Sequence, residues 1–489
     1  MRLPIDTPPG LRRDGSEGQS RGRWIRSSLV RGYGADVGPI LGWRKRSDNP
    51  ASGKARAVFA WADNGTPPAR RIAIGTHLGL FVQTAIGAIF DITPSGFVAG
   101  EPDATVNAGF GGGFYGVGTY GTPRSDTGTP MPAATWMLDN WGEYLVGCCF
   151  SDGRLMQWTL NTATDAAAIT NAPTGCQGLI STQDRFLLAL GASGNPRLIA
   201  WCDQENNAVW TPTATNQAGD KELDTGGSIV TGVELRGQTL ILTDVDAHVM
   251  QYIGPPFVFG MSKVGEGCGA ISVGCVVDQG DWAMWWSRSG FWRFDGAVTP
   301  VDCPLRDLDA NLNQGQRSKI VGWHNAKYTE VWWHYPSSAS TECDRYISFN
   351  YRTGEWWEGE LSRLGGTGST LFSFPLLVDA DGYVFEHEVG ALYDGATPFV
   401  RSGPVLLGDG SGVMRITGMV PDVVGAVRIG FQARDYPLSP PTTVASTALA
   451  TGRTDLRFTA RQLEMEVTFV ASEGRFGPCI LEAVAAGSR

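Results

Sequence analysis

The chain has 489 residues, of which 42% are apolar and only 18% are charged, and its 65 glycines and 28 prolines are spread along its whole length. This composition is typical of a turn-rich all-β protein and argues against a disordered chain. One hydrophobic core rarely supports so long a chain, so we expect a closed array of repeated sheets with a small companion domain.

The sequence contains no apolar run of about 18 residues, the length that a membrane helix needs. The opening residues MRLPIDTPPGLRRDG lack the apolar core of a signal peptide. We therefore expect a soluble protein with no membrane anchor, synthesised in the cytoplasm.

The first part of the chain is basic, although the net charge of the whole is −10. Residues 1–56 hold twelve Lys or Arg and five Asp or Glu, which leaves about −17 for the remainder. Within this part, RGRWIRSSLVRGYGADVGPILGW interleaves arginine with tryptophan and aliphatic residues, the types enriched at interface hot spots. The sequence thus predicts that residues 1–56 form a docking arm for an acidic protein surface, through Arg21, Arg23, Trp24, Arg26, Arg31 and Trp43.

Two other interpretations of the arm stay open. It could be a solvated tail, although such tails seldom contain two tryptophans. It could bind nucleic acid, although seven excess charges before an acidic body are a weak basis for that. If the arm only docks, a chain lacking residues 1–46 should fold and fail to join its assembly.

Short strands that follow a turn recur through residues 57–401, which we assign to a β-propeller. They are GLFVQT from Gly79, GRLMQW from Gly153, NPRLIAW from Asn195, AHVMQY from Ala247, GFWRF from Gly290 and GYVFEH from Gly382. Their starts lie 74, 42, 52, 43 and 92 residues apart, against a usual propeller repeat of about 40–50 residues. The wide gaps indicate insertions or further blades, so six or seven blades are expected.

Two stretches in this region carry distinct signals. Residues 282–357 place tryptophans on successive predicted strands, which is how a propeller fills its blades with large side chains. The glycine-rich GFGGGFYGVGTYGTP lacks the Lys-Ser/Thr of a phosphate-binding loop, and we interpret it as a flexible excursion.

Residues 402–489 change to a two-residue alternation that is typical of antiparallel strands with one face buried. Leu463, Met465 and Val467 alternate with polar residues, and VRIGFQAR from Val427 offers a partner strand. We expect a small antiparallel sheet or sandwich beside the propeller.

The reactive residues form no recognisable site. The nine cysteines make no CxxC pair and the five histidines no HxxxH spacing, so we expect buried thiols and no metal or cofactor. Asp281, Asp295, Asp302 and Glu355 lie near aromatic strands, but turn and rim roles fit them better than catalysis. No catalytic residue is assigned.

The order of these features resembles the tail nozzle, or packaged-DNA stabilisation, proteins of short-tailed bacteriophages. The matching segments are RGRWxxxxLVRG…GW (Arg21 to Trp43), VxLRGQTLILTDxxxxxxY (Val233 to Tyr252), GAISVGCVVDQGDWAMWWSRSGFWRFDG (Gly269 to Gly296) and NYRTGEWW (Asn350 to Trp357). The first segment is the most distinctive, because the others are also what any propeller would use.

The resemblance implies a structural virion protein without enzymatic activity. It would form a six-fold ring below the portal and its adaptor, extend the DNA exit channel and help to retain packaged DNA until ejection. The implied partners are the adaptor above, a further tail protein at the distal end, other copies of the chain, and double-stranded DNA that passes without sequence-specific binding. The alternatives are a glycan-binding or glycan-hydrolysing propeller, and another minor tail or fibre protein.

Overall fold

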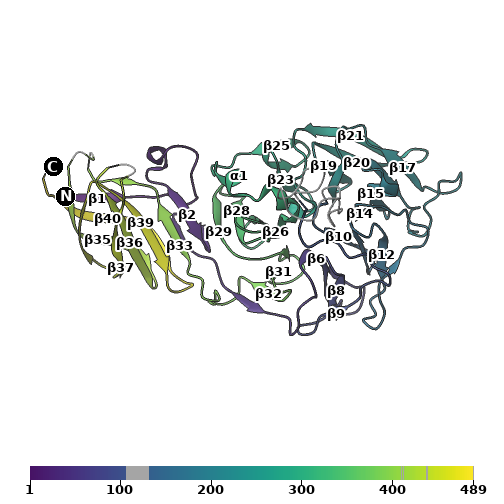
Figure 1. The fold of residues 1–489 in the computed structure, drawn as a ribbon, viewed down its shortest axis with the longest axis horizontal. Helices are drawn as coiled ribbons and strands as arrows, with labels where there is room; N and C mark the ends of the chain where they lie inside the picture. The colour runs from purple at the N-terminus through teal and green to yellow at the C-terminus, as the bar shows by residue number, and fades with distance from the viewer. Residues whose placement is uncertain (106–130, 409, 411, 437–438, 488–489) are drawn as a thin grey trace, which may run out of the picture.

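The computed structural model describes residues 1–105, 131–408, 410, 412–436 and 439–487. In these residues, seven antiparallel sheets of four strands each surround one cavity, which is lined by the first strand of every sheet. The chain is therefore a seven-bladed β-propeller with an additional β domain beside it (Figure 1). The glycine-rich stretch that we interpreted as an excursion lies largely outside the described residues.

Each blade runs from its innermost strand outwards, and the last blade borrows its outermost strand from the N-terminal part of the chain. The first three blades are β6 (Ala55–Ala62), β7 (Arg70–Thr76), β8 (Leu80–Gln83) and β9 (Phe90–Asp91); β10 (Trp136–Trp141), β11 (Tyr144–Cys149), β12 (Leu155–Trp158) and β13 (Ala167–Ala168); and β14 (Gly178–Ser181), β15 (Leu187–Leu190), β16 (Leu198–Trp201) and β17 (Gly219–Glu222). The next two blades are β18 (Ile229–Leu235), β19 (Gln238–Thr243), β20 (Asp246–Gly254) and β21 (Val258–Glu266); and β22 (Val276–Asp278), β23 (Ala283–Ser287), β24 (Gly290–Phe294) and β25 (Val298–Val301). The last two blades are β26 (Val321–Asn325), β27 (Glu330–Tyr335), β28 (Arg345–Asn350) and β29 (Trp356–Glu360); and β30 (Gly365–Thr367), β31 (Leu376–Val378), β32 (Val384–His387) and β5 (Trp43–Lys45).

The six recurring segments of the sequence are the third strands of six blades. They become β8, β12, β16, β20, β24 and β32. The gap of 92 residues holds the seventh blade, β26–β29, whereas the gap of 74 residues holds an insertion between β9 and β10.

Strand β5 closes the propeller by pairing antiparallel with β32. Trp43 lies opposite His387, Arg44 opposite Glu386 and Lys45 opposite Phe385. Pairing the N-terminal part of the chain with its last blade completes that blade with a fourth, outermost strand and joins the two ends of the array.

The second domain consists of two six-stranded antiparallel sheets. Sheet A contains β1 (Arg2–Ile5), β3 (Val30–Tyr33), β4 (Asp36–Pro39), β35 (Met414–Val424), β38 (Thr454–Ala460) and β40 (Arg475–Ala485); sheet B contains β2 (Trp24–Ser28), β33 (Phe399–Ser402), β34 (Val405–Leu406), β36 (Val427–Arg434), β37 (Thr442–Ala448) and β39 (Gln462–Phe469). The rings of Phe431 and Phe458 meet across the sheets with centroids 5.0 Å apart. The two sheets therefore form a β-sandwich with a shared core.

The sandwich corrects our expected domain boundaries. Residues 1–56 are not a separate arm, because β1–β4 belong to the two sandwich sheets and β5 belongs to the last blade. Figure 1 shows the N- and C-termini together at the end of the sandwich that lies away from the propeller. The sandwich thus contains both ends of the chain, and the propeller lies between them in sequence.

The helices are short: α1 (Leu308–Asn311) and the 3₁₀ helices η1 (Glu17–Ser20), η2 (Ala192–Gly194), η3 (Val273–Cys275) and η4 (Gln314–Lys319). No helix in the described residues is long and apolar enough to cross a membrane.

Candidate functional site

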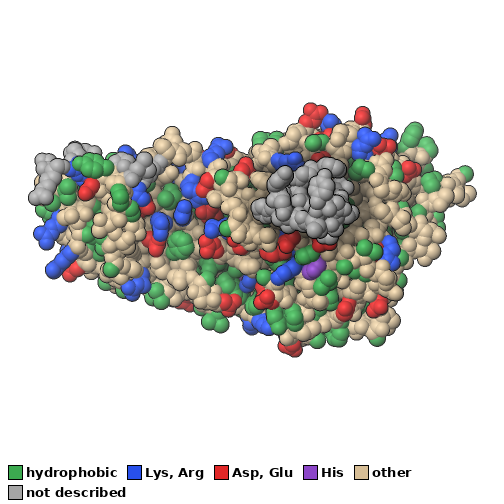
Figure 2. Space-filling view, viewed as in Figure 1, with side chains coloured by type: hydrophobic (Ala, Val, Ile, Leu, Met, Phe, Trp, Pro, Cys, Tyr) green, Lys and Arg blue, Asp and Glu red, His purple; other side chains and the backbone are tan. Residues whose placement is uncertain are grey.

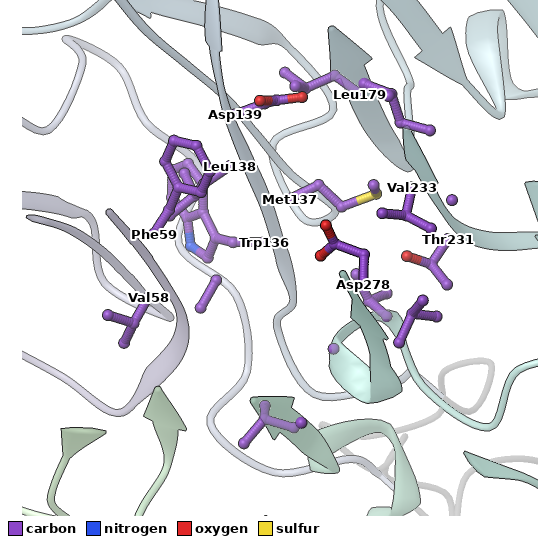
Figure 3. A pocket seen from close by; sticks show the side chains of 18 of the residues that line it. Val58, Phe59, Trp136, Met137, Leu138, Asp139, Leu179, Thr231, Val233 and Asp278 are labelled. Atoms are coloured by element: carbon purple, nitrogen blue, oxygen red, sulfur yellow. The ribbon is translucent and has the colours of Figure 1, made fainter. Parts of the chain in front are cut away.

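The central channel of the propeller is a cavity with a volume of about 330 Å³. Seven inner strands supply its wall, and its apolar part includes Val58, Leu138, Leu179 and Val233 (Figure 3). Glycine on an inner strand allows the blades to approach closely. A Cβ atom on Gly178 would lie 2.1 Å from the Sδ atom of Met137 in the neighbouring blade.

Three carboxylates line this channel: Asp139, Glu234 and Asp278. Each lies at or near the end of its inner strand, and the inner strands of a propeller run in the same direction, so the three lie toward one mouth. The carboxyl group of Asp278 points toward the middle of the channel (Figure 3). This mouth is therefore acidic.

The environment of the channel favours the protonated form of these acids. Burial, with smaller contributions from Asp278 and Glu234, raises the pKa of Asp139 to about 7, although its oxygens accept hydrogen bonds from the amides of Ser181 (2.8 Å) and Asn140 (2.7 Å). Burial also raises the pKa values of Glu234 and Asp278. We did not predict these three residues from the sequence. A polar residue near the end of a predicted inner strand is the signal that could have identified them.

The opposite mouth contains a charged network. The guanidinium of Arg56, near the start of β6, donates to both carboxylate oxygens of Glu342 (2.9 and 2.8 Å). The fully buried Lys319 donates to Glu342 (3.1 Å) and to the carboxylate of Asp103. Gln316 holds Ala104 through two hydrogen bonds of 2.9 and 3.0 Å. These contacts attach residues 103–104 to blades that are distant in sequence.

Arg31 joins the sandwich to the propeller through a buried ion network. Its guanidinium, carried by β3, donates to Glu330 on β27 (two bonds of 2.9 Å) and to Glu388 after β32 (3.1 Å). Its side chain is 3% exposed, and Glu330 and Glu388 are 3% and 4% exposed. Burial lowers the pKa of Arg31, but the two carboxylates more than offset this, so the pKa lies above its usual value. One arginine of the sandwich therefore holds two blades of the propeller.

Trp24 and Trp43 are also core residues. Trp24 is 1% exposed and packs edge-on against Phe476 of the facing sheet, at 6.3 Å between centroids. Trp43 is 5% exposed, stacks on His387 at 5.3 Å, and donates from its indole nitrogen to Asp394.

The docking residues expected from the sequence thus fall into two groups. Trp24, Arg31 and Trp43 were expected on a docking surface, but they are buried within the chain, because they complete its own sandwich, domain joint and last blade. Arg21 and Arg26 are exposed and Arg23 is half-buried, so a contact with a partner stays a prediction for these three.

The four carboxylates considered for catalysis have local contacts. Asp281 lies 3.1 Å from Arg236, Asp295 3.2 Å from Arg293 and Asp302 3.5 Å from Arg306. Glu355 accepts a hydrogen bond from the indole of Trp357 at 3.3 Å. Each of these four side chains thus has a partner within the chain, and their roles in turns and rims stay a prediction. In the part of the chain that the structure describes, no three His, Cys, Asp or Glu side chains group in a way that could hold a metal ion.

Comparison with known proteins identifies no family for this chain. Neither a protein-family model nor a curated protein matches the chain. Solved structures do match: virginiamycin B lyase from Staphylococcus aureus (9% identity over 70% of this chain and 97% of the lyase, TM-score 0.39), the Neurospora crassa Pan2 WD40 domain (11%, 73% and 97%, 0.39) and BamB from Moraxella catarrhalis (10%, 80% and 98%, 0.34). At such identities and scores, the reactions and assemblies of these proteins cannot be transferred to this chain.

Proposed function

We propose that this chain is a structural virion protein of the tail nozzle type, which extends the DNA exit channel of a short-tailed bacteriophage and helps to retain packaged DNA until ejection. The observation that carries the proposal is the position of the Arg21–Trp43 segment, the most distinctive part of the resemblance. This segment forms β2, β3, β4 and the start of β5, and runs from the sandwich to the last blade.

The residues of that segment have architectural roles. Trp24 fills the sandwich, Arg31 holds the sandwich against two blades, and Trp43 anchors the strand that closes the propeller. The Arg21–Trp43 segment therefore joins the two domains into one unit, as a structural component of a tail requires.

The charge of the chain suits a wall around DNA. A ring of about six copies would multiply the net charge of −10 into a strongly negative structure. A negative wall repels phosphate, so DNA would pass without adhering. In this proposal the adaptor lies above the ring and a further tail protein lies at its distal end.

Quantitative mass spectrometry of purified particles tests the proposal. The copy number of this chain should be about half that of the portal, as the proposed six-fold ring requires. Absence from particles, or a copy number in multiples of three for each appendage, would contradict the nozzle proposal. A glycan array would then be the next measurement, because propellers that bind sugars are the main alternative.

A further inference from the structure

The three carboxylates at the acidic mouth of the propeller channel have no ion pair in the part of the chain that the structure describes. Asp139 accepts hydrogen bonds from two backbone amides, and Glu234 accepts from the hydroxyl of Thr239 and the amide of Gln183. The carboxyl group of Asp278 has no hydrogen-bond partner in another described residue. Carboxylates withdrawn from bulk water are usually paired with a cation. This mouth therefore has an excess of negative charge that the chain itself does not neutralise.

A buried hydroxyl opens into the same channel. Thr231, on β18, is 2% exposed and lines the cavity, and Figure 3 shows its oxygen pointing toward Asp278. This hydroxyl has no hydrogen-bond partner among the described residues. Buried polar groups of folded proteins are nearly always satisfied by the chain, by water or by a ligand. A hydroxyl and a carboxylate together accept hydrogen bonds, so they fit a ligand that donates them.

The remaining wall of the channel fits a short hydrocarbon chain. Its apolar part includes Val58, Leu138, Leu179 and Val233. The volume of about 330 Å³ lies at the lower end of the range for small-molecule sites, roughly 300–1,000 Å³. The channel therefore suits a slender ligand with a polar group at one end.

The opposite mouth does not favour an anion. Arg56 also lines the cavity, but its guanidinium already donates to both carboxylate oxygens of Glu342. In the view of Figure 2, the propeller is hollowed near its centre, and acidic and basic side chains both lie beside the hollow. Among the described residues that line the cavity, an anionic ligand would thus find no unpaired cation, whereas a cationic ligand would find three unpaired carboxylates.

We propose that the channel binds an aliphatic amine, with its ammonium group at Asp278 and Thr231 and its methylene chain along the apolar wall. An ammonium group has three donors and no acceptor, which matches a mouth that offers acceptors. A metal ion fits less well, because no described His, Cys, Asp or Glu side chains group in threes around a possible metal position.

Two further points support an organic cation. Burial raises the pKa values of Asp139 and Asp278, and a bound ammonium group would favour their ionised forms. The methylene chain would cover apolar side chains that face the channel. The inference goes beyond the proposed function, because this site lies inside each propeller and not in a channel formed by several copies.

Isothermal titration calorimetry of the purified full-length chain with 1,5-diaminopentane at pH 8 tests the proposal. Both amino groups are charged at this pH, and we expect one diamine to bind per chain. The neutral 1,5-pentanediol has the same chain length and should bind at least tenfold more weakly, because it lacks the charge. A saturating concentration of the diamine should also raise the midpoint of urea unfolding, because a ligand that binds only the folded chain stabilises it.

Three variants locate the site. Asp278→Asn should weaken binding at least tenfold, because it removes a charge that faces the channel. Thr231→Val keeps the shape of the side chain, removes one acceptor and should weaken binding about threefold. Asp281→Asn is the matched control, because Asp281 is exposed, lies 3.1 Å from Arg236 and does not line the cavity. This control should bind the diamine as the wild type does, and urea unfolding without the diamine compares the stability of all three variants.

Three results would overturn the proposal: no binding of the diamine by the wild type, equal binding of the diol, or an equal loss in Asp281→Asn. The last would identify a general attraction of amines to an acidic surface. Tighter binding of acetyl-lysine amide than of the diamine would assign the site to a lysine of a partner protein, and would overturn a free amine as its ligand. None of these results alters the particle copy number, so the nozzle proposal is tested separately.

Discussion

The joint between the domains gives the sharpest stability prediction, through the substitution Arg31→Met. Methionine keeps much of the volume and removes the charge, which leaves Glu330 and Glu388 buried with no cation. Breaking a buried ion pair by removing one partner costs about 3–5 kcal/mol. We expect a loss at the upper end of this range, because a single arginine neutralises both carboxylates.

Urea unfolding at pH 8, followed by tryptophan fluorescence, measures this loss. The exposed Arg26→Met serves as the control and should change stability by less than about 0.5 kcal/mol. Adding Glu330→Gln and Glu388→Gln to Arg31→Met should recover more than half of the loss, because no unpaired buried charge then remains.

The pH dependence of Arg31→Met tests whether the unpaired charges of Glu330 and Glu388 cause the loss of stability. Burial and Glu388 already raise the pKa of Glu330 in the wild type, and removing Arg31 raises it further. A carboxyl group with a raised folded pKa stabilises the protein at low pH and loses that contribution as the pH rises. The loss in Arg31→Met should therefore be smaller at pH 5 than at pH 8. A cost below 1 kcal/mol, or one that does not change with pH, would refute the assignment of a buried ion network.

Three further substitutions have expected outcomes. Trp43→Ala should destabilise the chain by about 3–5 kcal/mol, because it removes the buried side chain that holds β5 against the last blade. Lys45→Ala on the same strand should cost under about 1 kcal/mol. The midpoints of urea unfolding of the two variants test this difference. The stability of Asp139→Asn relative to the wild type should increase by about 3–4 kcal/mol from pH 4 to pH 8, because a folded pKa of about 7 makes ionisation of Asp139 unfavourable as the pH rises. An equal difference in stability at the two pH values would contradict this. Burial and the charge of Arg363 lower the pKa of His334 to about 3. Neutral His334 therefore contributes stability to the folded chain above pH 6.5, and this stability is lost as the pH falls. The substitution His334→Phe should reduce the slope of stability against pH between pH 6 and pH 4 by up to about 1.4 kcal/mol per pH unit.

The propeller could be predicted because its signal is local. Each third strand follows a turn and ends in a polar or aromatic residue, so six of the seven blades were visible as repeated segments. The seventh blade was found only as a wide gap filled with tryptophans. Its third strand, RYISFN, is separated from β27 by the nine residues PSSASTECD, so no tight turn directly precedes it.

The role of the N-terminal residues could not be predicted, because their partners are far away in the sequence. Strand β1 pairs with β40, for example Arg2 with Glu482, and β5 pairs with β32. The sequence of a short strand does not indicate which strand it pairs with when that strand lies hundreds of residues away. Arg31 shows the same limit: arginine is usually exposed, and only the tertiary fold brings two buried glutamates to it.

This architecture changes how docking must be tested. A chain lacking residues 1–46 would lose β1–β4 from both sandwich sheets and β5 from the last blade, so it would expose the cores of both domains. Failure of that truncated chain to join a tail would then report misfolding, and would say nothing about docking. Charge reversal at Arg26 leaves every strand in place, because its side chain is exposed on β2. If such a variant unfolds as the wild type does in urea and still fails to assemble, the loss belongs to the contact surface alone.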